Sequence, residues 1–358
     1  MGTAPRYRWQ PTTAEIAARY GLRPSEVVRF DHNTSPFPTD WAPAIVAPMS
    51  RHLNEYPGAS YMPLRESIAR YVGGVPENVV PGAGIDEMIL LVAKAFGGPG
   101  TRSSTAVPTY PLYEIAAMQH HGEFKPVSYG ADLEYPLDGV SRMAESSNIT
   151  WLCVPNNPTG ERIPNTYIAE IIRKASGIVV IDAAYAEFAG DTWWKWVEAY
   201  DNLIVLQTLS KAFGLAALRV GYSIASPDLS ARLDAFRPPG SISTLSERIA
   251  RVALEDHSRM ERFVRFVSKE RERLAALLVS AGLTVYPSST NFLLCHVGPH
   301  ARGLAHGLVT KGIVVRSYPQ DHVLGDHLRF TVRSQKEDDR LVDMITWIYP
   351  QLLRTTNS

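Results

Sequence analysis

The feature that most constrains the fold is a series of short apolar segments, several rich in β-branched residues, that alternate with helical segments. The apolar segments are STAV (104–107), ITWLCV (149–154), GIVVID (177–182), NLIVLQT (202–208) and RVGYSIA (219–225). Helical patterns such as PNTYIAEIIRKAS (164–176) separate them. Because strands buried on both faces have continuous apolar runs, this alternation predicts a largely parallel sheet with helices on both faces.

The segments on either side of this series differ from it in character. Residues 1–50 are rich in proline and contain one short helical pattern, TTAEIAARYG (12–21). After residue 230, a long charged amphipathic helix (257–282) precedes strand patterns mixed with helices, and Ser334 with Glu337 resembles a capping box. We therefore expect an α/β fold with a large domain at 51–230 and a smaller α+β domain at 231–358. The arm of residues 1–50 would join the small domain.

Composition excludes several classes of protein. The 358 residues contain 36 Lys plus Arg and 36 Asp plus Glu, so no net charge favours nucleic acid or an anionic membrane. No apolar run approaches the roughly 18–20 residues that span a bilayer. The two cysteines, Cys153 and Cys295, lie in apolar strand-like segments and are expected to be buried reduced thiols, although a disulfide stays open. These observations predict a cytoplasmic globular protein that contacts neither membrane nor nucleic acid.

Polar residues follow several of the predicted strands, where open α/β sheets bind ligands. Asn157 lies in PNNPTG after the strand at 149–154, and Asp182 ends the strand at 177–182, with Tyr185 three residues later. An ordinary turn would also explain the first motif, and a helix N-cap would explain the aspartate. A buried aspartate is nevertheless costly unless a partner neutralises it.

A third strand leads into TLSKAFGLAALRVGY (208–222), which places Lys211 and Arg219 in an otherwise apolar segment. Most loop lysines are solvated surface charges. A partly desolvated lysine instead has a lowered pKa and can act as a nucleophilic amine. We expect the apolar residues to fold back toward the sheet and bring the two cations together.

A glycine-containing segment, GAGID, opens a predicted helix at residues 82–86. Backbone N–H groups at a helix N-terminus bind phosphate, although a GxG pattern is weak evidence by itself. Taken together, these groups match the needs of pyridoxal 5′-phosphate, namely a lysine, a carboxylate, donors to the phenolic oxygen, an aromatic ring and a phosphate site. No metal site is expected, because the histidines show no HExxH pattern.

The chain resembles the fold-type I aminotransferases of class I/II, and among them the histidinol-phosphate aminotransferase group. The resemblance extends from DHNTSPF (31–37) to LRFTVRS (328–334), and its most specific motifs are VPNNPTG, IDAAYAEF and TLSKAFGLAALRVGY. It implies an aspartate-aminotransferase-like fold, an enzyme of amino-acid biosynthesis, and pyridoxal phosphate held by Lys211 as a Schiff base. Asp182 would pair with the pyridine nitrogen, and Asn157 and Tyr185 would hold the phenolic oxygen.

The resemblance also implies the other ligands. Tyr110 would stack on the cofactor ring. Tyr56 would reach the phosphate of a neighbouring subunit, which implies a homodimer with shared active sites. The substrate would contact Asn33, Arg316 and Arg329. The remaining phosphate ligands would be Thr208, Ser210, Arg219 and the backbone of Gly84, Ile85 and Asp86.

The reaction expected from the resemblance is transfer of an amino group from an anionic amine or amino acid to a 2-oxo acid such as 2-oxoglutarate. Some residues depart from the family pattern: Ala183 replaces an acidic residue, Ser35 replaces an asparagine, and Arg333 stands where most of the group has glycine. An arginine at this position of the motif resembles the pattern of threonine-phosphate decarboxylases more closely. That activity, or transamination of an aromatic or basic amino acid, stays open, whereas a cofactor-sensing regulator would need a DNA-binding domain that the first fifty residues do not provide.

Overall fold

The computed structural model describes residue 7 and residues 9–355, which form two compact units. The first unit takes residue 7 and residues 38–157 and 162–263, and the second takes residues 9–37, 158–161 and 264–355. These limits describe compact units of the chain and do not test the expected domain boundaries at residues 50 and 230, which stay a prediction.

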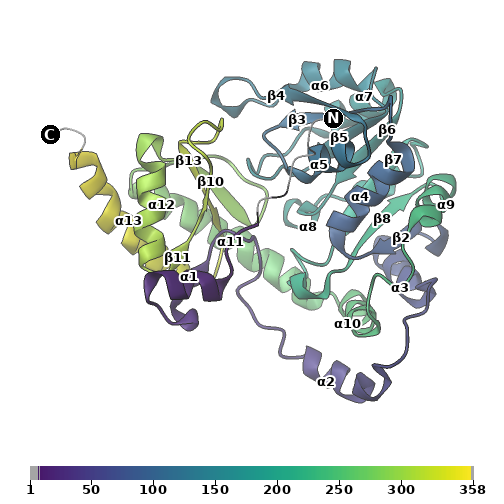
Figure 1. Cartoon of the computed structure of the whole chain (residues 1–358), viewed down its shortest axis with the longest axis horizontal. Coiled ribbons are helices and arrows are strands. Elements are labelled where there is room, and N and C mark those ends of the chain that lie inside the picture. Colours follow the sequence, from purple (N-terminus) through teal and green to yellow (C-terminus); the bar gives the residue numbers. More distant parts are fainter. Residues whose placement is uncertain (1–6, 8, 356–358) are drawn as a thin grey trace. The chain divides into compact units, whose positions relative to one another are not determined.

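A seven-stranded sheet forms the centre of the first unit, in the order β2-β8-β7-β6-β5-β3-β4 (Figure 1). All neighbouring strands are parallel except the two pairs that include β8. The predicted, largely parallel sheet is therefore confirmed. Its strands are β2 (Val79–Gly82), β3 (Arg102–Val107), β4 (Glu123–Ser128), β5 (Ile149–Cys153), β6 (Ile178–Asp182), β7 (Leu203–Thr208) and β8 (Gly221–Ala225).

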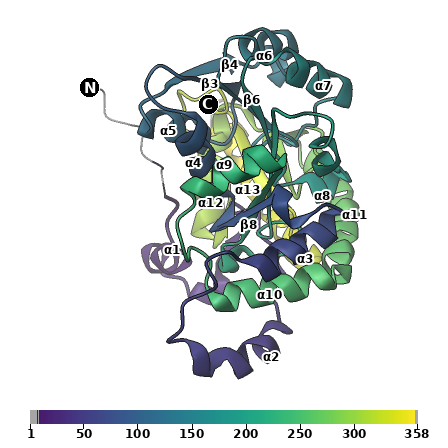
Figure 2. The same cartoon turned by 90° about the vertical axis from the view of Figure 1, so that its right-hand side faces the viewer.

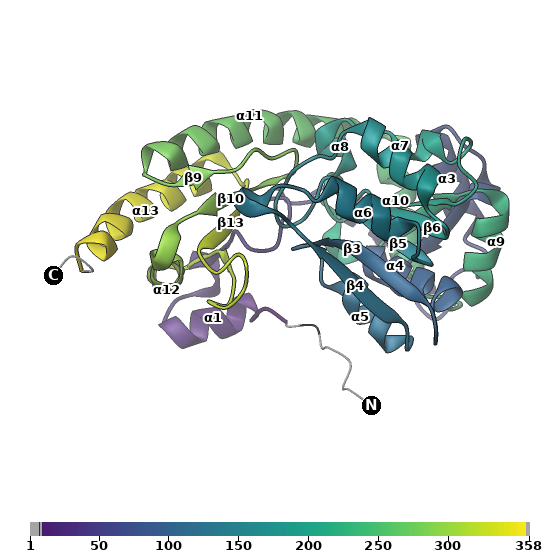
Figure 3. The ribbon, with the colours of Figure 1, turned by 90° about the horizontal axis from the view of Figure 1, so that it is seen from above.

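Helices cover both faces of this sheet, because successive strand residues point to opposite faces. Val179 and Ile181 of β6 pack with one group of helices, and Ile178 and Val180 pack with the other. Figure 3 shows helices α6 and α7 on one side of the strands and α4 and α5 on the other. The first group contains α3 (Met62–Val72), α6 (Leu137–Ala144), α7 (Asn165–Lys174) and α10 (Thr244–Glu255). The second group contains α4 (Gly84–Phe96), α5 (Leu112–Gln119) and α9 (Pro227–Phe236), of which α4 and α9 lie close together in Figure 2.

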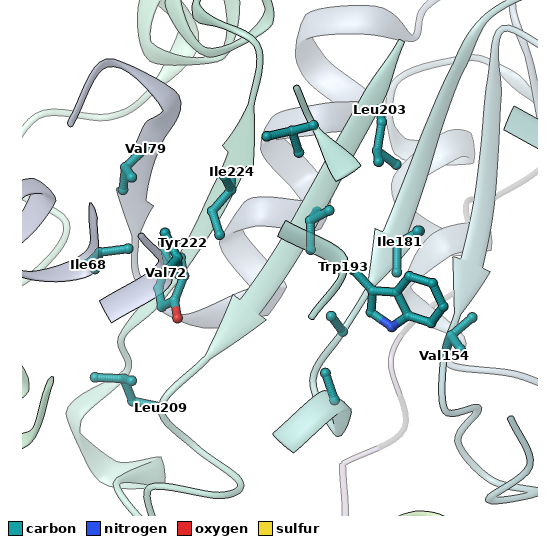
Figure 4. Close-up of a cluster of buried hydrophobic side chains, with 14 of the residues drawn as sticks. Ile68, Val72, Val79, Val154, Ile181, Trp193, Leu203, Leu209, Tyr222 and Ile224 are labelled. Atoms are coloured by element: carbon teal, nitrogen blue, oxygen red, sulfur yellow. The ribbon is translucent and has the colours of Figure 1, made fainter. Parts of the chain in front are cut away.

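Figure 4 shows part of the larger apolar cluster, in which Ile68 and Val72 of α3 lie beside Tyr222 of β8. Trp193, from the short helix Trp193–Trp196, fills the same cluster near Ile181. The short helices α2 (Ala42–Val46) and α8 (Ala186–Ala189) complete the α-helices that belong wholly to this unit among the described residues.

Two strands of this sheet were not predicted, and both are at its edges. Strand β2 contains Pro81 and β4 contains Pro126. A proline cannot donate to the hydrogen-bond ladder, so it weakens the strand signal and is tolerated at a sheet edge. Strand β4 also has no fully buried residue, so it lacks the apolar run by which the inner strands were found.

The second unit contains a four-stranded antiparallel sheet in the order β12-β13-β10-β9, and a parallel pair made of β1 and β11. The strand patterns predicted after residue 280 are confirmed as β9, β10, β11 and β13. The strands are β1 (Val28–Arg29), β9 (Thr284–Val285), β10 (Phe292–His296), β11 (Ile313–Val314), β12 (Arg316–Ser317) and β13 (His327–Thr331).

The predicted helices of the second unit are also present. Helix α1 (Thr13–Tyr20) begins with a capping box formed by Thr12 and Glu15, and α11 (Ser258–Ser280) begins in the first unit and continues into the second. Before α13 (Gln335–Thr355), the Ser334 hydroxyl and N–H donate to the Glu337 carboxylate at 2.6 and 3.2 Å. Helix α12 (Ala301–Thr310) completes the set within the described part of the chain.

Both cysteines are buried and free, as expected. Within residue 7 and residues 9–355, no helix is long and apolar enough to cross a membrane.

Candidate active site

Several predicted site residues lie at the carboxyl ends of strands in the first unit. Gly84 follows β2, Asn157 follows β5, Asp182 ends β6, and Lys211 follows β7. The register pairs Cys153 with Asp182 and Asp182 with Leu206, so the ends of β5, β6 and β7 lie at one edge of the sheet. The parallel arrangement therefore brings together groups that are far apart in the sequence.

The N-terminus of α4 is crossed by the side chain of Arg219. Gly84, the first residue of α4, has a φ of +83°, and a Cβ there would lie 2.7 Å from Arg219 Nη2. A Cβ at Gly221 would lie 2.5 Å from the Gly84 carbonyl carbon. Both glycines are therefore required for the close approach of β8, α4 and the guanidinium. The result is a cationic group beside free helical N–H groups, which is a suitable site for a phosphate.

Asp86 orients two of the predicted ligands. Its carboxylate accepts a hydrogen bond from the Tyr110 hydroxyl at 2.8 Å and from Arg219 Nη2 at 3.0 Å. Burial, followed by the charge of Asp86, raises the pKa of Tyr110, so this tyrosine stays protonated and acts as a donor. The Asp86 side chain thus holds the guanidinium and the aromatic ring in fixed positions, which the sequence had not indicated.

Thr208 and Ser210 form a small turn at the end of β7. The Ser210 N–H donates to Thr208 Oγ1 at 3.1 Å, and the two hydroxyl oxygens are 2.9 Å apart. Both residues are buried. A compact pair of hydroxyl groups beside the Arg219 loop is a suitable set of donors for phosphate oxygens.

The segment from Leu209 to Val220 folds back on itself. The expectation that this fold brings Lys211 and Arg219 together stays a prediction. Leu209 donates its N–H to the Val220 carbonyl, and Leu215 donates to the Leu209 carbonyl, both at 3.0 Å. Leu209 and Leu215 are buried, so these apolar residues close the loop, while Lys211 is half-buried and Arg219 is exposed. Lys211 Nζ lies 5.8 Å from the centroid of the Tyr185 ring.

Asp182 is buried at the end of β6. The Tyr113 hydroxyl donates to Asp182 Oδ2 at 2.6 Å, and the Ala184 N–H donates to Oδ1 at 3.1 Å. Burial raises the pKa of Asp182 to about 6, and these hydrogen bonds oppose part of the increase. Tyr185, rather than Asp182, is the N-cap residue of α8, so helix capping does not explain the aspartate.

Tyr113 and Asn156 are functional candidates that the sequence analysis missed. Tyr113 of α5 contacts Asp182 directly, and its position three residues after Tyr110 in PTYPLY was an available signal. Asn156 donates to the Pro108 carbonyl at 3.0 Å and accepts from the Thr109 hydroxyl at 2.7 Å. It therefore braces the loop before Tyr110, and the neighbouring Asn157 is the half-buried residue of the pair.

The predicted substrate residues lie in the second unit. Arg316 of β12 is the cross-strand partner of Arg329 of β13, so the two guanidinium groups project from the same face of the sheet. Arg329 is buried and its Nη2 donates to the Asp31 carbonyl at 2.7 Å. Asn33 is also buried, and its Oδ1 accepts from the Thr331 hydroxyl at 3.1 Å.

Arg333 is held by contacts within the protein. It donates to the Arg29 carbonyl at 3.1 Å and to the Glu337 carboxylate at 2.9 Å, and it lies over the Phe30 ring. These contacts give Arg333 a role in joining β1, β13 and α13.

Tyr56, the residue predicted to reach a neighbouring subunit, is 96% exposed.

Comparison with known proteins assigns the family. A family model described as "Aminotransferase class I and II" matches residues 25–345. The chain belongs to this family. It is a pyridoxal-phosphate-dependent aminotransferase, and the predicted enzyme class and cofactor are confirmed.

Histidinol-phosphate aminotransferases are among the relatives of this aminotransferase. The protein from Thermoanaerobacter pseudethanolicus is 39% identical over 297 residues, which cover 82% of this chain and 84% of that protein. The protein from Geobacillus thermodenitrificans is 33% identical over 354 residues, covering 96% and 95%. The crystal structure of histidinol-phosphate aminotransferase from Sinorhizobium meliloti, in complex with pyridoxal-5′-phosphate, has a TM-score of 0.88 at 24% identity and covers 96% of each chain. This likeness confirms the predicted aspartate-aminotransferase-like fold.

The geometry of the first unit fits the cofactor of an aminotransferase. Arg219, the α4 N-terminus and the Thr208–Ser210 turn offer a cation and neutral donors, as a phosphate monoester requires. A buried carboxyl group, Asp182, is available for a ring nitrogen, and Lys211 provides an amine. The phosphate donors and the carboxyl group come from different strand ends, so the sheet itself sets their separation.

Proposed function

We propose that this aminotransferase takes an amino group from histidinol phosphate and passes it to a 2-oxo acid such as 2-oxoglutarate. The observation that carries the donor assignment is the pairing of Arg316 with Arg329 across β12 and β13, because two guanidinium groups on one face suit a strongly anionic substrate. The relatives described above, at 39% and 33% identity, carry the name of this activity.

The proposed roles of the cofactor residues follow from their positions. Pyridoxal phosphate, when bound, supplies an electron sink that stabilises negative charge on the substrate's α-carbon. Asp182 would hold a proton on the ring nitrogen, since a buried carboxylate stabilises a neighbouring cation strongly. Tyr113 and the Ala184 N–H keep the Asp182 carboxylate oriented for this role.

Lys211 would provide the amine that attaches the cofactor and then accepts and returns a proton at Nζ. The closed loop from Leu209 to Val220 restricts where its side chain can reach. Asn157 and Tyr185 would donate to the phenolic oxygen, and Tyr110, held by Asp86, would cover the ring. The phosphate ligands would be Thr208, Ser210, Arg219 and the backbone of Gly84, Ile85 and Asp86.

We further propose a homodimer in which Tyr56 completes the neighbouring active site. The support is the exposure of this large aromatic side chain, 96% in the isolated chain, in a motif that resembles the family's intersubunit tyrosine. The two buried free thiols support a cytoplasmic location.

A donor panel tests the proposed substrate. The holoenzyme is assayed with histidinol phosphate, threonine phosphate, aromatic amino acids and arginine, each with 2-oxoglutarate, and release of CO₂ is followed in parallel. We expect the highest kcat/KM with histidinol phosphate and no CO₂. Release of CO₂ from threonine phosphate without dependence on the 2-oxo acid would instead identify the decarboxylase alternative.

A further inference from the structure

We propose that Tyr318 is a further specificity-determining residue, whose hydroxyl donates a hydrogen bond to a phosphate group held between Arg316 and Arg329. The proposal rests on the proposed function, since it assumes that this pair of arginines binds the anionic end of the substrate. It adds a hydroxyl donor, and a neighbouring histidine that fixes it, to a site for which the sequence had indicated Asn33, Arg316 and Arg329.

The position of Tyr318 follows from strand geometry. Arg316 begins the two-residue strand β12 and Tyr318 directly follows this strand, two residues after Arg316, which is the spacing of side chains on one face of an extended chain. The Arg316 guanidinium carbon lies 5.9 Å from the centroid of the Tyr318 ring. Because Arg316 faces Arg329 across the ladder, Tyr318 lies next to a pair of like charges.

The hydroxyl group of Tyr318 has an unmet hydrogen-bonding requirement. Its oxygen is buried, although the ring is only half-buried, and it makes no hydrogen bond within the protein. Buried hydroxyl groups nearly always have a partner, so an unpartnered one beside two arginines indicates a site for an acceptor. Burial raises the pKa of this tyrosine, and the charges of Arg329 and Arg316 offset only part of the increase, so the group remains a protonated donor.

His322 fixes the orientation of the Tyr318 ring. The two rings are stacked, with centroids 5.3 Å apart and an interplanar angle of 17°. His322 Nδ1 accepts from the Leu324 N–H at 3.0 Å, which holds the imidazole in place. Burial and then the charge of Arg316 lower the pKa of His322, so the ring that supports Tyr318 is neutral near pH 7.

The combination of donors selects a class of anion. Like charges directly opposite each other on a sheet are unfavourable, and a bound dianion removes this repulsion. Two guanidinium groups and one hydroxyl offer more donors than the two oxygens of a carboxylate can accept well, whereas a phosphate monoester has three terminal oxygens. The site therefore favours a phosphate monoester over a carboxylate.

The test measures binding of inorganic phosphate to the holoenzyme, in which the cofactor's own phosphate site is filled, by isothermal titration calorimetry at pH 7.5. Tyr318→Phe removes only the hydroxyl, and a hydrogen bond to a charged group is worth about 10- to 100-fold in affinity. We expect the Kd of phosphate to rise by at least about 10-fold. His322→Ala keeps the hydroxyl but removes its support, and should raise the Kd by about 3-fold.

Tyr349→Phe is the matched control, because the Tyr349 hydroxyl donates to the Val297 carbonyl at 2.9 Å and its loss should leave the Kd unchanged. Failure of the wild-type holoenzyme to bind phosphate, or an unchanged Kd in Tyr318→Phe, would overturn the proposal. If phosphate binding depends on Tyr318 but histidinol phosphate is not a donor, only the proposed substrate is wrong. If histidinol phosphate is a donor and Tyr318→Phe retains the wild-type KM, only the role of Tyr318 is wrong.

Discussion

The cofactor region of the first unit and the arginine pair of the second unit are built in different ways. Lys211, Asp182 and Gly84 each follow or end a strand of a mainly parallel sheet, so their relative positions come from the order of the strands. Arg316 and Arg329 are instead partners in one antiparallel ladder, and a shift of one residue would turn one of them to the opposite face. The first region therefore depends on topology, and the second depends on register.

The two regions should also differ in function. Substitutions in the cofactor region should change kcat and the absorption of the bound cofactor, because these residues would act on the reacting atoms. Substitutions in the arginine pair should change KM and leave the absorption unchanged. Three of the four experiments below test this separation, and the pH dependence of stability tests Asp182 alone.

The largest effect is expected for Lys211→Ala. Loss of the amine removes both the attachment point and the proton carrier, so kcat should fall by about 10,000-fold or more. Single-turnover kinetics and the visible absorption of the bound cofactor measure the two roles. Lys195→Ala, which removes an exposed lysine, is the control and should behave as wild type. Full turnover by Lys211→Ala would contradict the assignment.

Asp182→Asn should have the next largest effect. The amide is nearly isosteric and can still accept from Tyr113, but it carries no charge to hold a proton on the ring nitrogen. Loss of one member of a buried charge pair costs about 3–5 kcal/mol, so kcat should fall by roughly 100- to 5,000-fold. A variant with wild-type kcat would show that the ring nitrogen is held by another group.

The pH dependence of stability tests the same carboxyl group in the protein without cofactor. The pKa of Asp182 is about 6 in the folded protein, whereas an unperturbed aspartate, as in the unfolded chain, has a pKa of 3.8. The Asp182 carboxyl group therefore keeps its proton to higher pH in the folded protein. Stability contributed by the neutral carboxyl is therefore lost as pH rises from about 4 to about 6, by up to about 3 kcal/mol. Chemical denaturation from pH 4 to 7 measures the free energy of unfolding of wild type and of Asp182→Asn. The difference between the two free energies should change with pH over this range, and a difference that is the same at every pH would contradict the assignment.

The smallest effect is expected for Arg329→Lys in the second unit. Lysine keeps the charge but loses the planar pair of donors, so KM for the preferred substrate should rise about 10-fold while kcat changes little. The cofactor absorption should be unchanged. Arg302→Lys, at an exposed position of α12, is the control. A changed absorption in Arg329→Lys would show that the two regions are not functionally separate.

The sequence predicted the inner strands of the large sheet and the main helices, because continuous apolar runs indicate burial and glycines mark where helices end. It did not reveal β2 and β4, where Pro81 and Pro126 weaken the strand signal at the sheet edges. It identified Asp182 from its position at the end of a strand, but not Tyr113, which donates a hydrogen bond to Asp182 and lies 69 residues away in the chain.

The sequence by itself determined the family, the cofactor and the candidate residues at strand ends, because each depends on a short contiguous motif such as TLSKAFGLAALRVGY. Only the tertiary structure decided which partners those residues have. Asp86 links Tyr110 to Arg219, and Arg316 faces Arg329 with Tyr318 beside them. These arrangements depend on register and on contacts between distant segments, and the identity of neighbouring residues in the chain carries no direct signal for either.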